Sequence, residues 1–162
     1  MPRPPAVLLA LLFALIAPAA AHAQAEVPDT TRIRGRPIEP IAGVRLGYPM
    51  KLSGFVGLAL VDHRTKDDWS GWSLTVERGF GGAQVGIGKT VGMPFHSTAR
   101  MQLAVLRTMG DPWLVGPDRT WVGIDDTLTF LHAGFTLSVF ARVPGQEFDP
   151  KVLIAAGLVV AL

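Results

Sequence analysis

The stretch that decides the fold is KVLIAAGLVVAL, residues 151–162. In an extended chain every second side chain shares a face. One face of this stretch is then entirely apolar, with Val152, Ile154, Ala156, Leu158, Val160 and Leu162. The other face includes Lys151, Ala155 and Gly157. We expect this stretch to close a small membrane barrel, because one face suits lipid and the other suits a narrow interior.

The same alternation recurs from residue 41 onward, interrupted by short segments that contain Gly, Pro and Asp. It predicts eight strands, at about residues 41–48, 50–61, 69–78, 83–91, 98–109, 119–130, 134–143 and 151–162. An even number of strands of roughly ten residues, joined by turns, is typical of membrane barrels. The predicted fold is all-β, an eight-stranded antiparallel up-and-down transmembrane β-barrel.

The composition agrees with a barrel that has little charged surface. Of the 162 residues, 49% are hydrophobic and 17% are charged, compared with about 25% charged residues in an average globular protein. The 15 Lys and Arg and the 13 Asp and Glu are scattered, so nucleic acid is not an expected partner. Cysteine is absent, which excludes disulfides, thiolate metal sites and the lipid-bearing cysteine of a lipoprotein.

The first 23 residues predict a cleavable signal peptide. Arg3 supplies the positive charge, residues 6–17 form an apolar run, and Ala21-His22-Ala23 is the expected cleavage site. The apolar run is too short for a spanning helix, which needs about 20 residues. Residues 24–40 contain three prolines and do not alternate, which predicts a flexible periplasmic leader before a barrel of residues 41–162. The expected location is the outer membrane, with the periplasm as the alternative.

The distribution of charge separates a membrane barrel from a soluble one. A soluble barrel exposes its polar face to water and carries many Lys and Glu there. The less apolar face of this chain consists mostly of Gly, Ala, Ser and Thr. Small residues of this kind suit a narrow interior and leave room for Phe55 and Phe140. The aliphatic face is then expected to contact lipid.

Aromatic residues are expected to form belts at the two membrane interfaces. With the N-terminus in the periplasm, Trp69, Trp72, Phe95, Phe130 and Phe135 fall near the periplasmic rim. Tyr48, Phe80, Trp113, Trp121 and Phe148 fall near the outer rim.

Three parts of the chain carry a resemblance to a known family. They are GYPMKLSGFVGLAL (47–60), VLRTMGDPW (105–113) with PDRTWVGIDD (117–126), and IAAGLVVAL (154–162). With them, residues 41–162 resemble the small eight-stranded outer-membrane β-barrel proteins of bacteria. The resemblance implies contact with outer-membrane lipid and with the barrel-assembly machinery during insertion. Many such barrels end in Phe, and Leu162 departs from that ending.

Charged residues on the predicted strands are the candidate site. The candidates on the inward face are Lys51, Glu77, Arg100, Asp125 and Arg142. Isolated charges are costly there, so we expect ion pairs, with a polar-ligand site or an ion path as the alternative. Arg78 and Arg107 fall on the outward face near strand ends and are candidates for contact with lipid headgroups.

Asp126 fits the predicted barrel least well. Strict alternation places it on the outward face in the middle of a strand, where a charge is costly in lipid. Either a bulge turns it inward, or the sixth strand is shifted by one residue.

No residues predict a catalytic, metal or cofactor site. His63, His96 and His132 each fall in a predicted turn, and their spacing does not indicate a metal site. His96 and Ser97 resemble the His and Ser of outer-membrane lipid A deacylases. In that family one residue separates the His from the Ser, and Asn follows. In this chain His96 and Ser97 are adjacent, and Thr98 follows.

The predicted function is that of a small, monomeric outer-membrane barrel with a structural or lipid-contact role in the envelope and no catalysis. The first alternative is a soluble periplasmic lipocalin-like barrel that binds an apolar ligand, which requires aliphatic side chains to point inward. The second is an outer-membrane lipid-modifying enzyme, which requires a His and a hydroxyl group to converge on the outward surface.

Overall fold

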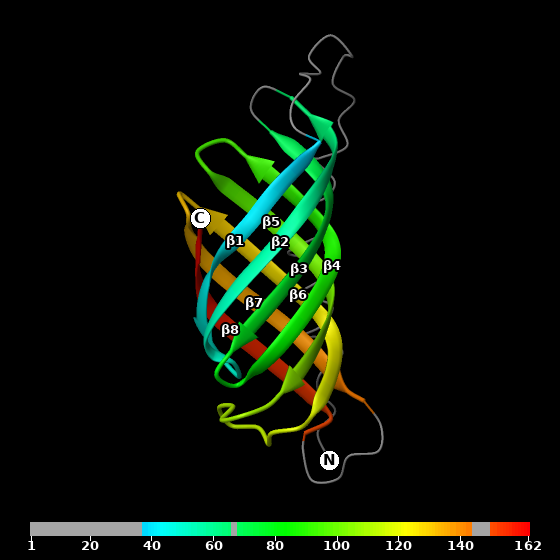
Figure 1. The fold of residues 1–162 in the computed structure, drawn as a ribbon, viewed down its shortest axis with the longest axis vertical. Helices are drawn as coiled ribbons and strands as arrows, with labels where there is room; N and C mark the ends of the chain where they lie inside the picture. Colours follow the sequence, from blue (N-terminus) through cyan, green and yellow to red (C-terminus); the bar gives the residue numbers. More distant parts are fainter. Residues whose placement is uncertain (1–36, 66–67, 144–149) are drawn as a thin grey trace, which may run out of the picture. The chain divides into compact units, whose positions relative to one another are not determined.

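The computed structural model describes residues 37–65, 68–143 and 150–162, and this part of the chain is all-β. The strands are β1 (Ile38–Gly47), β2 (Lys51–Arg64), β3 (Trp69–Gly79), β4 (Gly82–Met93), β5 (Ser97–Thr108), β6 (Thr120–Phe130), β7 (Ala133–Arg142) and β8 (Val152–Ala161) (Figure 1). Within these ranges no helix is long and apolar enough to cross a membrane. The predicted signal peptide and the leader up to residue 36 lie outside the described residues.

Each strand pairs antiparallel with its neighbour in the sequence, and β8 pairs with β1, so the sheet closes. The predicted eight-stranded antiparallel up-and-down barrel is therefore confirmed. The pairing is staggered. Followed from partner to partner, the residues paired with Ile38 of β1 lead round the barrel to Ala156 of β8. Ala156 lies beside Tyr48 and not beside Ile38, since its carbonyl oxygen accepts a hydrogen bond from the Tyr48 amide at 3.0 Å. A shift from position 38 to position 48 over eight strands corresponds to a strand tilt of roughly 40–45°.

The aliphatic row of every strand points out of the barrel. On β8, Val152, Ile154, Leu158 and Val160 are between 47% and 67% exposed. Exposed aliphatic or aromatic side chains also lie on each of the other seven strands, for example Leu58, Leu74, Ile87, Leu103 and Phe135. The barrel therefore carries an apolar belt, which we define as these outward rows.

The inward rows fill the barrel with two kinds of side chain. A polar layer contains buried Arg, Glu, Asp, Gln, Ser and Thr residues. An apolar cluster contains Met50, Ala104, Leu106, Val115, Trp121, Phe140, Leu153 and Ala155. Phe55 and Phe140, the two large residues expected inside, are both buried. Hydrophobic burial thus stabilises only the part of the interior that holds the apolar cluster, and the polar layer is held together by hydrogen bonds and ion pairs.

Two strand boundaries differ from the prediction. β1 begins at Ile38, so residues 38–40, assigned to the leader, pair with β2 instead. β2 continues to Arg64, past residues predicted to be a polar connection, because a bulge between Val61 and His63 shifts the register. A bulge interrupts the alternation on which the prediction depends.

The two ends of the barrel are built differently. The C-terminal rim holds the β2–β3, β4–β5 and β6–β7 connections and the end of β8, and it lies uppermost in Figure 1. The loop rim holds the β1–β2, β3–β4, β5–β6 and β7–β8 connections. At the loop rim, the Pro49 carbonyl accepts a hydrogen bond from the Trp113 amide at 3.0 Å, and the Met50 side chain is buried in the apolar cluster. The β1–β2 turn therefore folds over the end of the lumen.

The aromatic belts are less regular than predicted. Trp72, Phe95, Phe130 and Phe135 at the C-terminal rim and Phe80 and Trp113 at the loop rim are exposed. The prediction of an outer belt is wrong for two residues. Trp121 is fully buried, and Tyr48 packs against the apolar cluster. Trp121 shares the inward row of β6 with Asp125, so alternation along the strand decides its direction although it lies near a rim. Phe148 lies outside the described residues.

Candidate functional site

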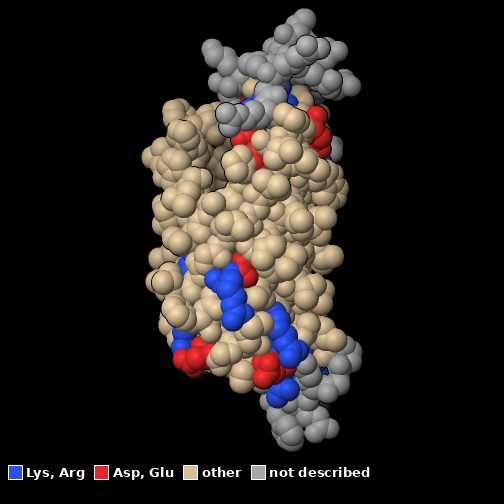
Figure 2. Space-filling view, in the orientation of Figure 1, with Lys and Arg blue, Asp and Glu red and all other residues tan. Residues whose placement is uncertain are grey.

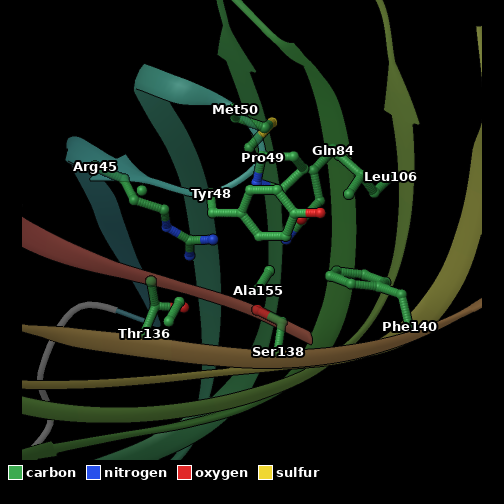
Figure 3. A pocket seen from close by; sticks show the side chains of 12 residues that line it. Arg45, Tyr48, Pro49, Met50, Gln84, Leu106, Thr136, Ser138, Phe140 and Ala155 are labelled. Carbon is green, nitrogen blue, oxygen red and sulfur yellow. The ribbon is translucent and has the colours of Figure 1, made fainter. Parts of the chain in front are cut away.

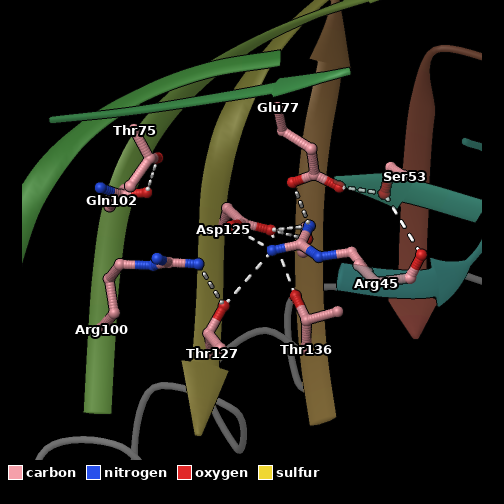
Figure 4. A network of polar contacts seen from close by, with 10 residues as sticks. Arg45, Ser53, Thr75, Glu77, Arg100, Gln102, Asp125, Thr127 and Thr136 are labelled. Carbon is pink, nitrogen blue, oxygen red and sulfur yellow. Dashed lines mark hydrogen bonds and ion pairs between the residues drawn. The ribbon is translucent and has the colours of Figure 1, made fainter. Parts of the chain in front are cut away.

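Arg45 is the centre of the polar layer. Its Nη1 and Nη2 each donate a hydrogen bond to one carboxylate oxygen of Asp125, both at 3.1 Å. Nη1 also lies 3.4 Å from the Glu77 carboxylate. The three side chains come from β1, β6 and β3, so one guanidinium connects distant parts of the wall across the lumen (Figure 4). A bidentate pair of this kind fixes geometry as well as charge.

Hydroxyl groups complete the coordination of the two carboxylates. The Ser53 hydroxyl donates to Glu77 at 2.5 Å. The hydroxyls of Ser138 and Thr136 donate to Asp125 at 2.5 Å and 3.3 Å. Buried carboxylates are tolerated where such donors replace water. The polar layer therefore also ties β2 and β7 to the strands that carry the charges.

Arg100 is the second buried guanidinium of this layer. Its Nη2 donates to the Thr127 hydroxyl at 3.3 Å, and its guanidinium carbon lies 5.0 Å from the centre of the Phe55 ring. Its Nε, like that of Arg45, has no hydrogen-bond partner. Arg45 and Arg100 together balance the formal charges of Glu77 and Asp125. The four residues thus form a neutral but incompletely hydrogen-bonded group, named here the lumen charge cluster.

A neutral hydrogen-bond chain extends the polar layer along β3, β4 and β5. The Thr75 hydroxyl donates to Gln102 Oε1 at 2.8 Å, and Gln102 Nε2 donates to the Ser73 hydroxyl at 3.1 Å. Thr90 donates to the same Ser73 hydroxyl at 2.6 Å. These side chains are buried. The lumen at this level is therefore occupied by side chains that bind one another.

The predicted inward residues divide into two groups. Glu77, Arg100 and Asp125 lie in the lumen charge cluster. Lys51 lies at the loop rim and pairs with Asp111 of the β5–β6 connection, and Arg142 is half-buried at the end of β7. The sequence interpretation missed Arg45, the residue that joins the cluster. Its position on the inward row of β1 was the available signal, since Val44 and Leu46 on either side are aliphatic.

A cavity of about 10 Å³ lies between the polar layer and the apolar cluster (Figure 3). Arg45, Gln84, Thr136 and Ser138 line it on the polar side. Its other lining residues include Tyr48, Met50, Leu106, Phe140 and Ala155. This volume is about the space that one water molecule needs. The cavity is too small for an apolar ligand of the kind that lipocalin-like barrels enclose.

Arg78 and Arg107 lie in one row on the outer surface near the loop rim. Both pair with Ala83 of β4, so one small residue separates them. Arg107 donates to the Thr120 hydroxyl at 2.9 Å and lies 3.4 Å from the Asp118 carboxylate. Arg78 contacts the sulfur of Met109. The Asp118 carboxylate thus partly balances the positive charge of Arg107. The Met109 sulfur that Arg78 contacts is neutral and does not balance its charge.

The turn histidines are arranged in a way that the sequence spacing did not indicate. His96 and His132 stack, with ring centroids 4.7 Å apart, while His63 lies in β2. Ser97 is buried, and its hydroxyl lies 3.5 Å from the Phe95 carbonyl. His96 is exposed, so the two residues on which the enzyme alternative rests do not converge on the outer surface. Among the described residues, no group of three or more His, Cys, Asp or Glu is placed to hold a metal ion.

Comparison with known proteins gives no relative. The chain matches no family model, no curated protein and no solved structure. The geometry of the barrel is therefore the basis on which a function can be assigned.

Replacing Asp125 tests the lumen charge cluster. We expect Asp125→Leu to lower the free energy of unfolding by about 3–5 kcal/mol, because it leaves Arg45 buried with only part of its counter-charge. The double variant Arg45→Met/Asp125→Leu retains Glu77 and Arg100, a neutral pair, and should recover most of that loss. Equilibrium urea unfolding followed by tryptophan fluorescence measures both. A double variant as unstable as Asp125→Leu alone would contradict the charge argument.

Proposed function

We propose that this protein is a small outer-membrane β-barrel with a structural or lipid-contact role in the bacterial envelope. The observation that carries the proposal is the apolar belt: every strand presents exposed aliphatic or aromatic side chains on its outward row. Soluble monomers rarely expose contiguous apolar patches larger than a few hundred Å². A lipid environment removes this cost, and a closed sheet leaves no unpaired strand edge in it.

The dimensions of the belt support the same proposal. On β2 it extends from Leu52 to Leu60, which on a strand tilted by roughly 40–45° spans roughly 20 Å along the barrel axis before side chains are added. Apolar bands of outer-membrane barrels are about 25 Å tall. On the face in Figure 2, a band in the upper half of the barrel shows no charged side chain, and charged side chains lie above it and, from about mid-height downward, below it.

The lipocalin-like alternative requires the opposite orientation of the side chains. Its aliphatic row would line a cavity, whereas here the lumen contains the charge cluster and a cavity of about 10 Å³. The aliphatic row of β8 is exposed. These observations favour lipid over an enclosed apolar ligand as the partner of the aliphatic rows. The expected partners are outer-membrane lipid and, during insertion, the barrel-assembly machinery, with a monomer as the working state.

Membrane fractionation and gel migration test the proposal together. We expect the protein to leave the envelope fraction only with detergent, because the apolar belt is solvated by lipid. We also expect unboiled and boiled samples to migrate differently, because a closed barrel resists detergent until it is heated. Recovery in a periplasmic wash, with one migration position in both samples, would contradict the proposal.

Asp126 gives a second test, since it remains on the outward row. β6 pairs with both neighbours without a register shift, and Asp126 lies between Met101 of β5 and Leu137 of β7. Neither a bulge nor a shifted strand turns this carboxylate inward. In lipid, Asp126→Leu should raise the free energy of unfolding by about 1–2 kcal/mol, because an outward charge at mid-wall is costly there.

Urea unfolding in lipid vesicles measures the effect of Asp126→Leu. Asp68→Leu is the matched control, because Asp68 is exposed beside the β2–β3 connection at the rim. It should leave the free energy of unfolding within about 0.5 kcal/mol of the parent. A destabilising effect of Asp126→Leu in vesicles would mean that this part of the wall does not face lipid.

Arg78 and Arg107 test contact with lipid headgroups. We expect Arg78→Gln to weaken binding to vesicles that carry phosphorylated lipids about fivefold, since one basic residue near such a surface contributes about 1 kcal/mol. Arg107→Gln should have a smaller effect, because Asp118 already balances part of its charge. Arg64→Gln, at the opposite rim and paired with Glu39, is the control. Equal binding by all three variants would exclude a headgroup role for these arginines.

A further inference from the structure

Two connections bring His96 and His132 together at the C-terminal rim. His96 precedes β5, and His132 lies between β6 and β7. The imidazole rings stack, with centroids 4.7 Å apart and planes inclined by 23°. Both residues are exposed. An ion in solution can therefore reach the pair without passing through the barrel.

The backbone of both connections is strained at the histidines. Phe95 and His96 have φ angles of 59° and 52°, and Leu131 and His132 have φ angles of 50° and 73°. This left-handed region costs most residues about 1–2 kcal/mol, and tight hairpins usually place Asn or Gly there. Lys51, Leu114 and Asp118 adopt the same region elsewhere, so the positive φ angles fix the geometry of these turns and do not by themselves mark a site. Here both strained pairs end in a histidine, and the two histidines meet.

Hydrogen bonds hold the two connections in place. The His132 amide donates to the His96 carbonyl at 3.4 Å, and the His132 carbonyl accepts from the Ala161 amide at 2.7 Å. At the start of β5, the Thr98 amide donates to the Thr129 hydroxyl at 3.1 Å, and the two threonine hydroxyls are 2.8 Å apart. The rings therefore project from a braced rim, so little backbone order has to be gained for both to bind one ligand.

We infer that His96 and His132 form a binding site for a divalent transition-metal ion. Imidazole nitrogens bind such ions at about 2.0–2.1 Å, which places the centres of two rings on one ion roughly 5 Å apart. The observed separation of 4.7 Å matches that value. In the stacked arrangement the ring planes are only 23° apart, so both rings must rotate about χ2, a broad torsion for histidine, before a nitrogen of each can face a shared ion. This inference does not depend on the proposed membrane location.

The expected ion is one that two imidazoles bind with water in the remaining positions. Because the described residues offer no third His, Cys, Asp or Glu at this point, the site is open and exchangeable. Nitrogen ligands bind Cu²⁺ more tightly than the other divalent ions of the first transition series. Cu²⁺ is therefore the probe of choice, and it tolerates two neighbouring nitrogens and two waters in a square plane.

The test is a Cu²⁺ titration of the folded full chain, purified without a polyhistidine tag and followed by electron paramagnetic resonance. We expect one ion per chain, with hyperfine structure from two imidazole nitrogens. His96→Asn and His132→Asn should each weaken binding more than about tenfold and leave one imidazole in the spectrum. Asn is used because it tolerates the left-handed conformation that both positions require.

The third histidine of the described residues provides the matched control. His63→Asn should leave affinity and spectrum unchanged, because His63 lies in β2 outside the stacked pair. The double variant His96→Asn/His132→Asn measures binding by the N-terminal amine and other background groups. A parent spectrum that the double variant reproduces would overturn the inference, as would loss of binding in His63→Asn or in only one of the two other single variants.

Discussion

The seam between β1 and β8 is the constraint on which the rest of the barrel depends. It pairs residues 43–47 with residues 157–161, which is shorter than the pairing between any other two neighbouring strands. The Tyr48 amide and the Leu162 amide extend it by one hydrogen bond at each end, to Ala156 and Ala42. Closure pairs the first and last strands with each other over this seam. The stagger is an even number of residues, so inward residues lie beside inward residues around the whole wall. A shift by one residue would exchange the two faces of every strand at once.

The lumen charge cluster depends on that closure. Arg45 is on β1 and Asp125 is on β6, so their side chains meet across the interior only when the seam sets the stagger. The pair then adds contacts between parts of the wall that do not share backbone hydrogen bonds. A buried pair is weak evidence of net stability, because desolvation of both charges offsets their attraction. Its clearer effect is to disfavour other staggers, in which either charge would be buried alone.

Alternation along the sequence was enough to predict the strands and the direction of most side chains. It placed Glu77, Arg100 and Asp125 inside. By strict alternation it also placed Asp126 outside, but the bulge or register shift expected to turn Asp126 inward is absent, because β6 pairs continuously with both neighbours. It could not predict which inward charges meet, because contacts across a lumen depend on the stagger, and the stagger is a property of the closed ring. For the same reason it grouped Lys51 and Arg142, which lie at the loop rim, with the cluster. It left out Arg45 although alternation places that residue on the inward row of β1. The stacking of His96 and His132 depends on two turns that are neighbours only in the folded barrel.

The way in which the lumen is filled limits where a barrel of this kind can act. Polar side chains bind one another across its middle, and toward the loop rim the apolar cluster closes over them beneath the β1–β2 turn. A solute that entered would have to displace both the charge cluster and well-packed aromatic side chains, and each step leaves buried groups without partners. A ligand that binds at the outer wall or at a rim does not have to displace buried side chains, because the side chains there are already exposed. Contacts made by the described residues are therefore expected at the apolar belt, the Arg78 row and the His96–His132 rim, with the lumen serving to hold these surfaces in shape.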